Sequence, residues 1–157
     1  MSNQAPQVGE KVADIEVAAT GDKTLSLADF AGRHLVLYFY PRDNTPGCTR
    51  EGQEFRDAYK DFTAAGAEIL GASRDSLKTH ENFRAKQEFP FDLLSDPDEE
   101  LCRHFDVIKE KNMYGRKVLG IERSTFLIDK DGVLRQEWRK VRVPGHVEAV
   151  LEAVRAL

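Results

Sequence analysis

Apolar and polar positions alternate along the chain in short blocks, and these blocks predict strands and helices in turn. The apolar run 35–40 has the length of one buried strand. Further on, Phe55, Tyr59 and Phe62 recur at the three- and four-residue spacing of one buried helix face. The same patterns predict a helical turn at 27–32 and helices at 46–65, 76–88, 98–105 and 146–157. They predict single strands at 35–40, 68–72 and 91–94. They also predict two hairpins, one of strands 15–18 and 23–27 and one of strands 123–129 and 133–138.

Three segments carry more specific expectations. In the helix 76–88, Leu77, Phe83 and Ala85 are expected to face the core. The stretch 109–120 is mostly polar and predicts an irregular loop, and the polar residues 1–14 are expected to cover the surface.

The order of these elements predicts the fold class. Strands that alternate with helices form a parallel core sheet, and the late hairpin adds an antiparallel part. We therefore expect an α/β protein, a thioredoxin-like three-layer sandwich with a mixed central sheet, helices on both faces and an N-terminal hairpin. With 157 residues and no linker or repeat, the chain is expected to form a single domain, 1–157.

Composition argues against nucleic acid and membrane as partners. Charged residues make up 32% of the chain and the net charge is −4, so no general basic field favours nucleic acid as a partner. No apolar run approaches the roughly 20 residues of a membrane helix, and the first residues show neither a signal core nor a transit pattern. We expect a cytoplasmic protein with no membrane partner, whose thiols stay reduced.

The chain has two cysteines, Cys48 and Cys102, which lie 54 positions apart. They form neither a disulfide framework nor the C-x-x-C spacing of a zinc site or a dithiol redox centre, which disfavours a thiol–disulfide oxidoreductase. The four histidines are scattered and lack metal-ligand spacing, so we expect no metal.

Cys48 stands where a thiolate would be stabilised. Thr45 suits the N-cap of the helix that follows the apolar run, and Pro46 suits its first position. Cys48 is then the third helical residue, where backbone N–H groups lack intrahelical partners and the helix dipole favours an anion. This pattern predicts a reactive cysteine. Cys102 shares a predicted helix face with Leu101, which favours packing in the core.

These residues also carry a resemblance. Pro41-x-x-x-Thr45-x-x-Cys48 resembles the active-site signature of the peroxiredoxins. Longer segments resemble the peroxiredoxin Q subfamily, also called bacterioferritin comigratory protein; they are 38–51, 114–116 and 120–129. The resemblance implies a thiol-dependent peroxidase that reduces hydrogen peroxide and organic hydroperoxides without metal, haem or flavin.

The resemblance also implies roles for individual residues. Cys48 matches the peroxidatic cysteine, which becomes a sulfenic acid, and Thr45 matches the hydroxyl that contacts thiolate and peroxide. Pro41 matches the residue that shields the pocket. Arg123 matches the arginine that approaches the sulfur from a distant strand, and Glu51 matches a carboxylate behind the site.

One departure from the subfamily concerns how the sulfenic acid is reduced again. Many members of the subfamily carry a resolving cysteine either five residues after the peroxidatic one or on the following helix. Here Gln53 stands at the first place, and the helix 76–88 contains no cysteine. We therefore expect reduction by an external thiol such as thioredoxin, glutaredoxin or a small thiol, with Cys102 as a less favoured resolving cysteine. The subfamily implies a monomer or weak homodimer.

Two other classes stay open from sequence. One is a thioredoxin-fold binding module with a vestigial cysteine. The other is a thiol–disulfide oxidoreductase, which the absent C-x-x-C disfavours. Composition alone also leaves a Cys–His hydrolase, because its partners meet only in space. The motif around Cys48 favours the peroxidase over all three.

Overall fold

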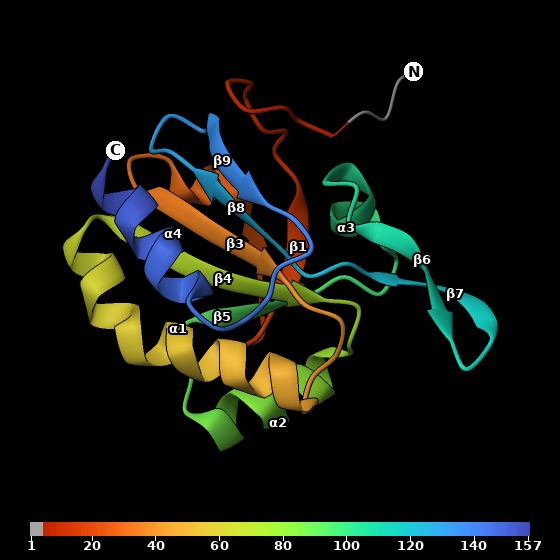
Figure 1. Ribbon diagram of the computed structural model, residues 1–157. Coiled ribbons are helices and arrows are strands. Elements are labelled where there is room, and N and C mark those ends of the chain that lie inside the picture. Colours follow the sequence, from red (N-terminus) through yellow and green to blue (C-terminus); the bar gives the residue numbers. More distant parts are fainter. Residues whose placement is uncertain (1–4) are drawn as a thin grey trace.

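Residues 5–157, which the computed structural model describes, build a seven-stranded mixed sheet with helices on both faces (Figure 1). The strand order is β2-β1-β5-β4-β3-β8-β9. Strands β3, β4 and β5 run parallel to one another, while β1 and β8 run antiparallel to their neighbours β5 and β3. The expected mixed sheet, N-terminal hairpin and late hairpin are therefore confirmed. Of the polar N-terminal stretch, residues 1–4 lie outside the described part of the chain.

The bounds of the elements differ from the expected ones by a few residues at most, apart from 109–120. The strands are β1 (Glu16–Ala19), β2 (Lys23–Ser26), β3 (His34–Phe39), β4 (Ala67–Ser73), β5 (Asp92–Ser95), β6 (Ile108–Met113), β7 (Arg116–Ile121), β8 (Ser124–Ile128) and β9 (Leu134–Trp138). The helices are the 3-10 turn η1 (Leu27–Phe30), α1 (Pro46–Ala64), α2 (Leu77–Gln87), α3 (Glu100–His104) and α4 (His146–Arg155). Within residues 5–157, no helix is both long and apolar enough to cross a membrane.

The sheet separates two hydrophobic cores, because successive strand residues point to opposite faces. On β3, Val36 and Tyr38 face the core shared with α1, α2 and α4. Leu35, Leu37 and Phe39 face the other core, which α3 and η1 cover. Every residue from 35 to 40 is therefore buried, which explains the unbroken apolar run in the sequence.

The prediction of a loop at 109–120 is wrong. Strands β6 and β7 form a separate two-stranded antiparallel sheet, which we call the arm, and it projects from the body (Figure 1). Tyr114 and Gly115 both have positive φ angles, 53° and 78°, as in the two-residue turns that suit hairpins. Most arm residues are exposed, so no buried face imposes alternation and the period-2 signal is missing.

The expectation that Leu77 faces the core is also wrong. Leu77 is the first residue of α2 and is exposed, and Ala85 is exposed too, whereas Phe83 is buried as expected. His80 takes the inward place one turn after Ser76, the N-cap whose hydroxyl accepts the N–H of Thr79. The inward face of α2 therefore combines an aromatic ring with a buried histidine.

A glycine inside α1 permits close packing against the segment after α2. A Cβ at Gly52 would lie 2.4 Å from the ring of Phe89, which is too close for any side chain. We expect Gly52→Ala to lower the free energy of unfolding by about 1–3 kcal/mol through overpacking, measured by urea denaturation. Lys60→Ala, at an exposed position of the same helix, should change it by less than about 0.5 kcal/mol. Equal effects of the two substitutions would contradict this account.

Candidate active site

Cys48 lies at the start of α1, beyond the carboxyl end of β3. Thr45 is the N-cap and Pro46 the first helical residue, so Cys48 is the third. The first intrahelical bond runs from the N–H of Thr49 to the carbonyl of Thr45, which leaves the N–H groups of Gly47 and Cys48 without helical partners. The thiol is buried, with 2% of the residue exposed, in the core under α1.

Arg123 reaches this sulfur from the junction between β7 and β8. Its Nη2 donates to Cys48 Sγ at 3.3 Å, and its Nη1 donates to Glu51 Oε1 at 2.6 Å. Glu51 stands three residues after Cys48 and shares its helix face. A Cβ at Gly47 would lie 3.1 Å from Arg123 Nη2, so the glycine leaves room for the guanidinium. The arrangement forms a chain from carboxylate to guanidinium to sulfur.

Burial dominates the electrostatics of Glu51. The residue is fully buried, and this raises the pKa of its carboxyl group to about 7, although Arg123 acts in the opposite direction. Its second oxygen, Oε2, finds no hydrogen-bond partner among residues 5–157. Burial also lowers the pKa of Arg123, but the charges of Glu51 and Cys48 outweigh it and the net pKa is raised. The guanidinium therefore stays charged beside the sulfur.

The titration of Glu51 predicts a pH-dependent stability. Its pKa rises from 4.5 to about 7 on folding, so the folded state holds a proton that the unfolded state releases between these values. The contribution of this proton to the free energy of unfolding is fully present below the unfolded-state pKa of 4.5 and is lost as the pH rises through about 7. We expect the unfolding free energy of Glu51→Gln, relative to wild type, to increase by about 3 kcal/mol between about pH 4.5 and pH 8. Urea denaturation at both pH values measures it, and a constant difference would mean that Glu51 stays ionised.

Thr45 and Pro41 belong to the loop between β3 and α1. The hydroxyl of Thr45 donates to the carbonyl of Arg42 at 3.0 Å and makes no capping hydrogen bond, although its backbone occupies the N-cap. Pro41 follows the buried Tyr40 and is itself half-buried. The structure thus brings Thr45 to the helix start next to Cys48 and places Pro41 at the end of the core strand.

A buried network that sequence reasoning missed holds the same loop. Asp43 accepts the hydroxyl of Tyr40 at 2.6 Å and lies 2.6 Å from Nδ1 of His80, while Nε2 of His80 lies 2.9 Å from the carbonyl of Leu94. The side chains of Asp43 and His80 are both completely buried. Oxygen and nitrogen atoms of Asp43, Asp75 and His80 lie within 4.8 Å of one another, but both polar atoms of Asp43 and of His80 already have protein partners. The cluster therefore serves to fix the loop.

Cys102 lies on the other side of the sheet from Cys48. It is completely buried in the core that α3 covers, whereas Cys48 belongs to the core of α1. Burial raises the pKa of the Cys102 thiol, and the carboxylate of Asp96 beside it raises it further. The structure does not bring the two sulfurs together on one face of the sheet.

The two buried histidines are engaged away from Cys48. His80 binds Asp43, and His146 shares a 2.8 Å hydrogen bond with the hydroxyl of Thr125. Burial lowers the pKa of His146 to about 4, and the charge of Arg123 acts in the same direction. Within residues 5–157, the sulfur of Cys48 accepts a hydrogen bond from Arg123 and has none with a histidine. The site therefore lacks the Cys–His pair that a hydrolase uses.

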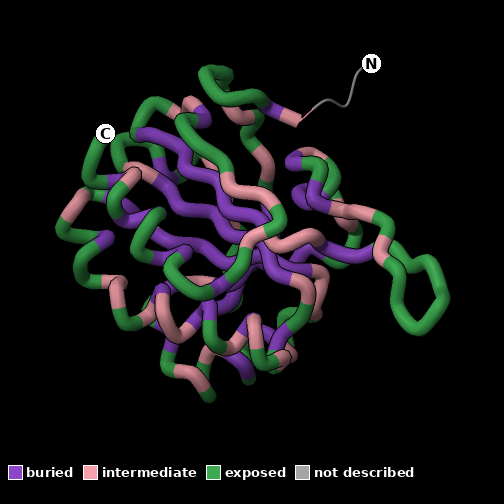
Figure 2. Tube along the Cα trace, viewed as in Figure 1, coloured by how far each residue is buried: buried purple, intermediate pink, exposed green. Residues whose placement is uncertain are grey.

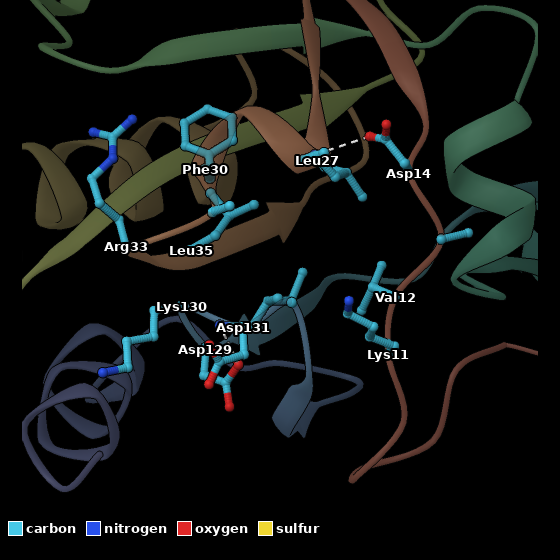
Figure 3. A pocket seen from close by; sticks show the side chains of 15 residues that line it. Lys11, Val12, Asp14, Leu27, Phe30, Arg33, Leu35, Asp129, Lys130 and Asp131 are labelled. Carbon is cyan, nitrogen blue, oxygen red and sulfur yellow. Dashed lines mark hydrogen bonds between the residues drawn. The ribbon is translucent and has the colours of Figure 1, made fainter.

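A separate pocket of about 370 Å³ opens at the other end of the sheet (Figure 3). Leu35, at the amino end of β3, and Phe30 contribute to its apolar wall, and Lys11, Lys130 and Asp131 stand at its edge. Cys48, Arg123, Glu51, Thr45 and Pro41 do not line it, so the chemistry at Cys48 does not depend on this pocket.

Comparison with known proteins identifies the family. The model of the AhpC/TSA family matches residues 8–137. "Peroxiredoxin Bcp" of Xanthomonas campestris is 58% identical over 143 residues, which cover 91% of this chain and 89% of that protein. "Peroxiredoxin Bcp" of Bacillus subtilis is 46% identical over 149 residues, which cover 95% of each protein.

Solved structures agree with the sequence relatives. A structure of Xanthomonas campestris bacterioferritin comigratory protein, described in terms of alkyl peroxide reduction, has a TM-score of 0.87 at 57% identity and covers 90% of each chain. A Xylella fastidiosa peroxiredoxin Q mutant has a TM-score of 0.92 at 46% identity and covers 98% of each chain. The expected thioredoxin-like fold is thereby confirmed. The chain belongs to the AhpC/TSA family and is a peroxiredoxin, a thiol-dependent peroxidase of the peroxiredoxin Q type.

Proposed function

We propose that Cys48 is the peroxidatic cysteine of this peroxiredoxin and that its substrates are hydrogen peroxide and organic hydroperoxides. The observation that supports this most directly is the 3.3 Å hydrogen bond from Arg123 to the sulfur at a helix start. The alkyl peroxide reduction described for the Xanthomonas relative supports the wider substrate range. The whole chain, 1–157, then acts as one catalytic domain.

The first half of the reaction is a displacement at oxygen. The thiolate of Cys48 attacks one peroxide oxygen, so an S–O bond forms as the O–O bond breaks. The product is a sulfenic acid, and the leaving oxygen takes up a proton to become water or an alcohol. Negative charge therefore moves from sulfur to the departing oxygen, and donors along that line gain strength as the bond breaks.

The neighbouring groups have distinct roles in this proposal. Arg123 donates both to the sulfur and, as charge moves, to the peroxide oxygens, while Glu51 holds the guanidinium in position. The hydroxyl of Thr45 already donates to the carbonyl of Arg42, so its lone pairs are available to accept the O–H of the peroxide. Pro41 shields the sulfur from bulk water.

The second half of the reaction requires an external thiol. The sulfenic acid is reduced by thioredoxin, glutaredoxin or a small thiol, because Cys102 packs in the opposite core as a protonated thiol. This reductant supply suits a reducing compartment such as the cytoplasm. A monomer or weak homodimer suffices, since every proposed catalytic residue comes from one chain.

The decisive experiment is to oxidise the protein and map its sulfurs. We expect peroxide consumption that depends on added thiol, and a sulfenic acid trap that labels Cys48 and leaves Cys102 unmodified in peptide mass spectra. An abundant disulfide between the two cysteines would overturn external reduction. A protein that leaves peroxide untouched with every thiol would overturn the peroxidase itself.

A further inference from the structure

The arm has an unusual surface for a water-exposed hairpin. Seven large hydrophobic residues are classed as exposed in the described part of the chain, and four of them lie on the arm: Met113, Tyr114, Val118 and Leu119. Figure 2 shows the tip of the projecting arm as exposed and its base as half-buried or buried. Exposed apolar side chains that gather in one place mark interaction sites more often than singly scattered ones do.

The charge of the arm is opposite to that of the protein. Residues 108–121 contain four basic side chains and one acidic one, a net charge of +3, in a chain whose net charge is −4. Clustered charge of one sign steers a partner of the other sign and selects against like-charged partners. The arm therefore suits an acidic partner with an apolar centre.

The base of the arm adjoins the catalytic sulfur. Leu119 stands four residues before Arg123, at most about 13 Å away at the rise of an extended strand. Lys111, which pairs with Val118 across the arm, donates to the carbonyl of Ile121. Burial lowers the pKa of Lys111, and the charges of Arg123 and Cys48 are close enough to act on it as well.

A hollow of about 360 Å³ lies beside the loop between β3 and α1, which we call the catalytic loop. It is lined by Pro41, Arg42, Arg74, Asp75, Pro97 and Glu99, and Arg74 is paired with Glu99 at 2.7 Å. Arg74 also donates to the carbonyl of Leu119 at 3.3 Å, which connects the hollow to the arm. Arg42, on the catalytic loop, is exposed and adds a second basic side chain to the lining of the hollow.

We propose that Arg42, Arg74, Lys117 and Leu119, which we call the donor face, bind the protein dithiol that reduces oxidised Cys48. This inference rests on the proposed function and names the partner of the same site. A donor sulfur must touch Cys48, and an ordinary interface buries about 800 Å² per partner, a patch of roughly 16 Å radius. A protein donor centred on the sulfur covers Arg123 and so reaches the end of β7, two residues before it, where an acidic surface on the donor meets the basic arm.

A dithiol donor returns the sulfenic acid of Cys48 to the thiolate in two steps. One donor thiolate attacks the sulfur of Cys48, which forms a mixed disulfide as the S–O bond breaks and hydroxide leaves as water. The second donor thiol then attacks the donor's own sulfur in that bond. Cys48 leaves as thiolate, the donor becomes a disulfide, and two electrons have passed to the oxygen that came from peroxide.

Steady-state kinetics with two reductants test the donor face. With thioredoxin, kept reduced by its reductase and NADPH, we expect Leu119→Glu to raise the KM for thioredoxin at least about fivefold. With dithiothreitol the same variant should turn over peroxide at the wild-type rate, because a small thiol needs no docking surface. Val8→Glu is the matched control, since Val8 is also 56% exposed but lies on the N-terminal segment. The wild-type KM for thioredoxin should also rise with ionic strength.

Each other outcome has a defined meaning. The donor face is refuted if Leu119→Glu affects the KM for thioredoxin no more than Val8→Glu does, or lowers the dithiothreitol rate equally. A wild-type dimer that Leu119→Glu dissociates in sedimentation would assign the face to a second copy of the chain instead. The proposed function is judged separately, by the oxidation of reduced wild-type protein by peroxide in a single turnover without any donor.

Discussion

Replacing Arg123 with alanine is expected to lower the rate constant for reaction of Cys48 with hydrogen peroxide by about 10²- to 10³-fold, the cost of removing one oxyanion donor. Ionisation of the sulfur alone cannot account for a loss of this size. A free thiol of pKa near 8.5 is about 3% ionised at pH 7, so complete ionisation gains only about 30-fold. A more acidic thiol is also a weaker nucleophile, which reduces that gain further. Most of the effect must therefore arise in the transition state.

Stopped-flow oxidation of the reduced variant measures the rate, and the ultraviolet absorbance of the thiolate measures the ionised fraction of Cys48. Arg135→Ala is a matched control, because Arg135 is another arginine of this sheet paired with a carboxylate, Asp129, at 3.2 Å. Arg123→Lys should recover only part of the rate, since an ammonium cannot donate to Glu51 and to the sulfur in the fixed fork of a guanidinium. A rate loss that merely follows the fall in thiolate would contradict the transition-state account.

The parts of the fold that the sequence predicted well are those with a strong local cause. The run 35–40 is buried on both faces of the sheet, so its apolar character is continuous and its identity as β3 follows directly. The start of α1 was predicted to the residue, because Thr45-Pro46 is a local signal for an N-cap and first position. Both features depend on residues within a few positions of one another.

The parts that were missed depend on contacts between distant residues or on the absence of a core. The arm packs on little and therefore lacks alternation; the turn Tyr114-Gly115 was its available signal. His80 and Asp43 are 37 positions apart and meet because α2 packs beside the loop between β3 and α1, which no short-range pattern encodes. Arg123 is 75 positions from Cys48, and only the resemblance to a family suggested that they meet.

The buried pair of Asp43 and His80 leads to the second large prediction. Nε2 of His80 carries a proton, because it faces the carbonyl oxygen of Leu94. A second proton is shared between Nδ1 of His80 and the carboxyl group of Asp43, which lie 2.6 Å apart. Asp43→Ala removes the acceptor for both His80 and Tyr40 in a site closed to water. We expect this variant to lose about 3–5 kcal/mol of unfolding free energy, measured by urea denaturation.

Asp43→Asn is the matched control, because an asparagine can satisfy the same contacts with a neutral histidine. Its amide oxygen accepts the hydroxyl of Tyr40, and its NH₂ group donates to Nδ1 of His80. This variant should therefore lose less than about half as much stability as Asp43→Ala. Equal losses in the two variants would mean that the charge of the pair, rather than its hydrogen bonds, stabilises the loop. Since that loop carries Pro41 and Thr45, peroxide oxidation of Cys48 should slow in Asp43→Ala even under conditions where the variant is fully folded.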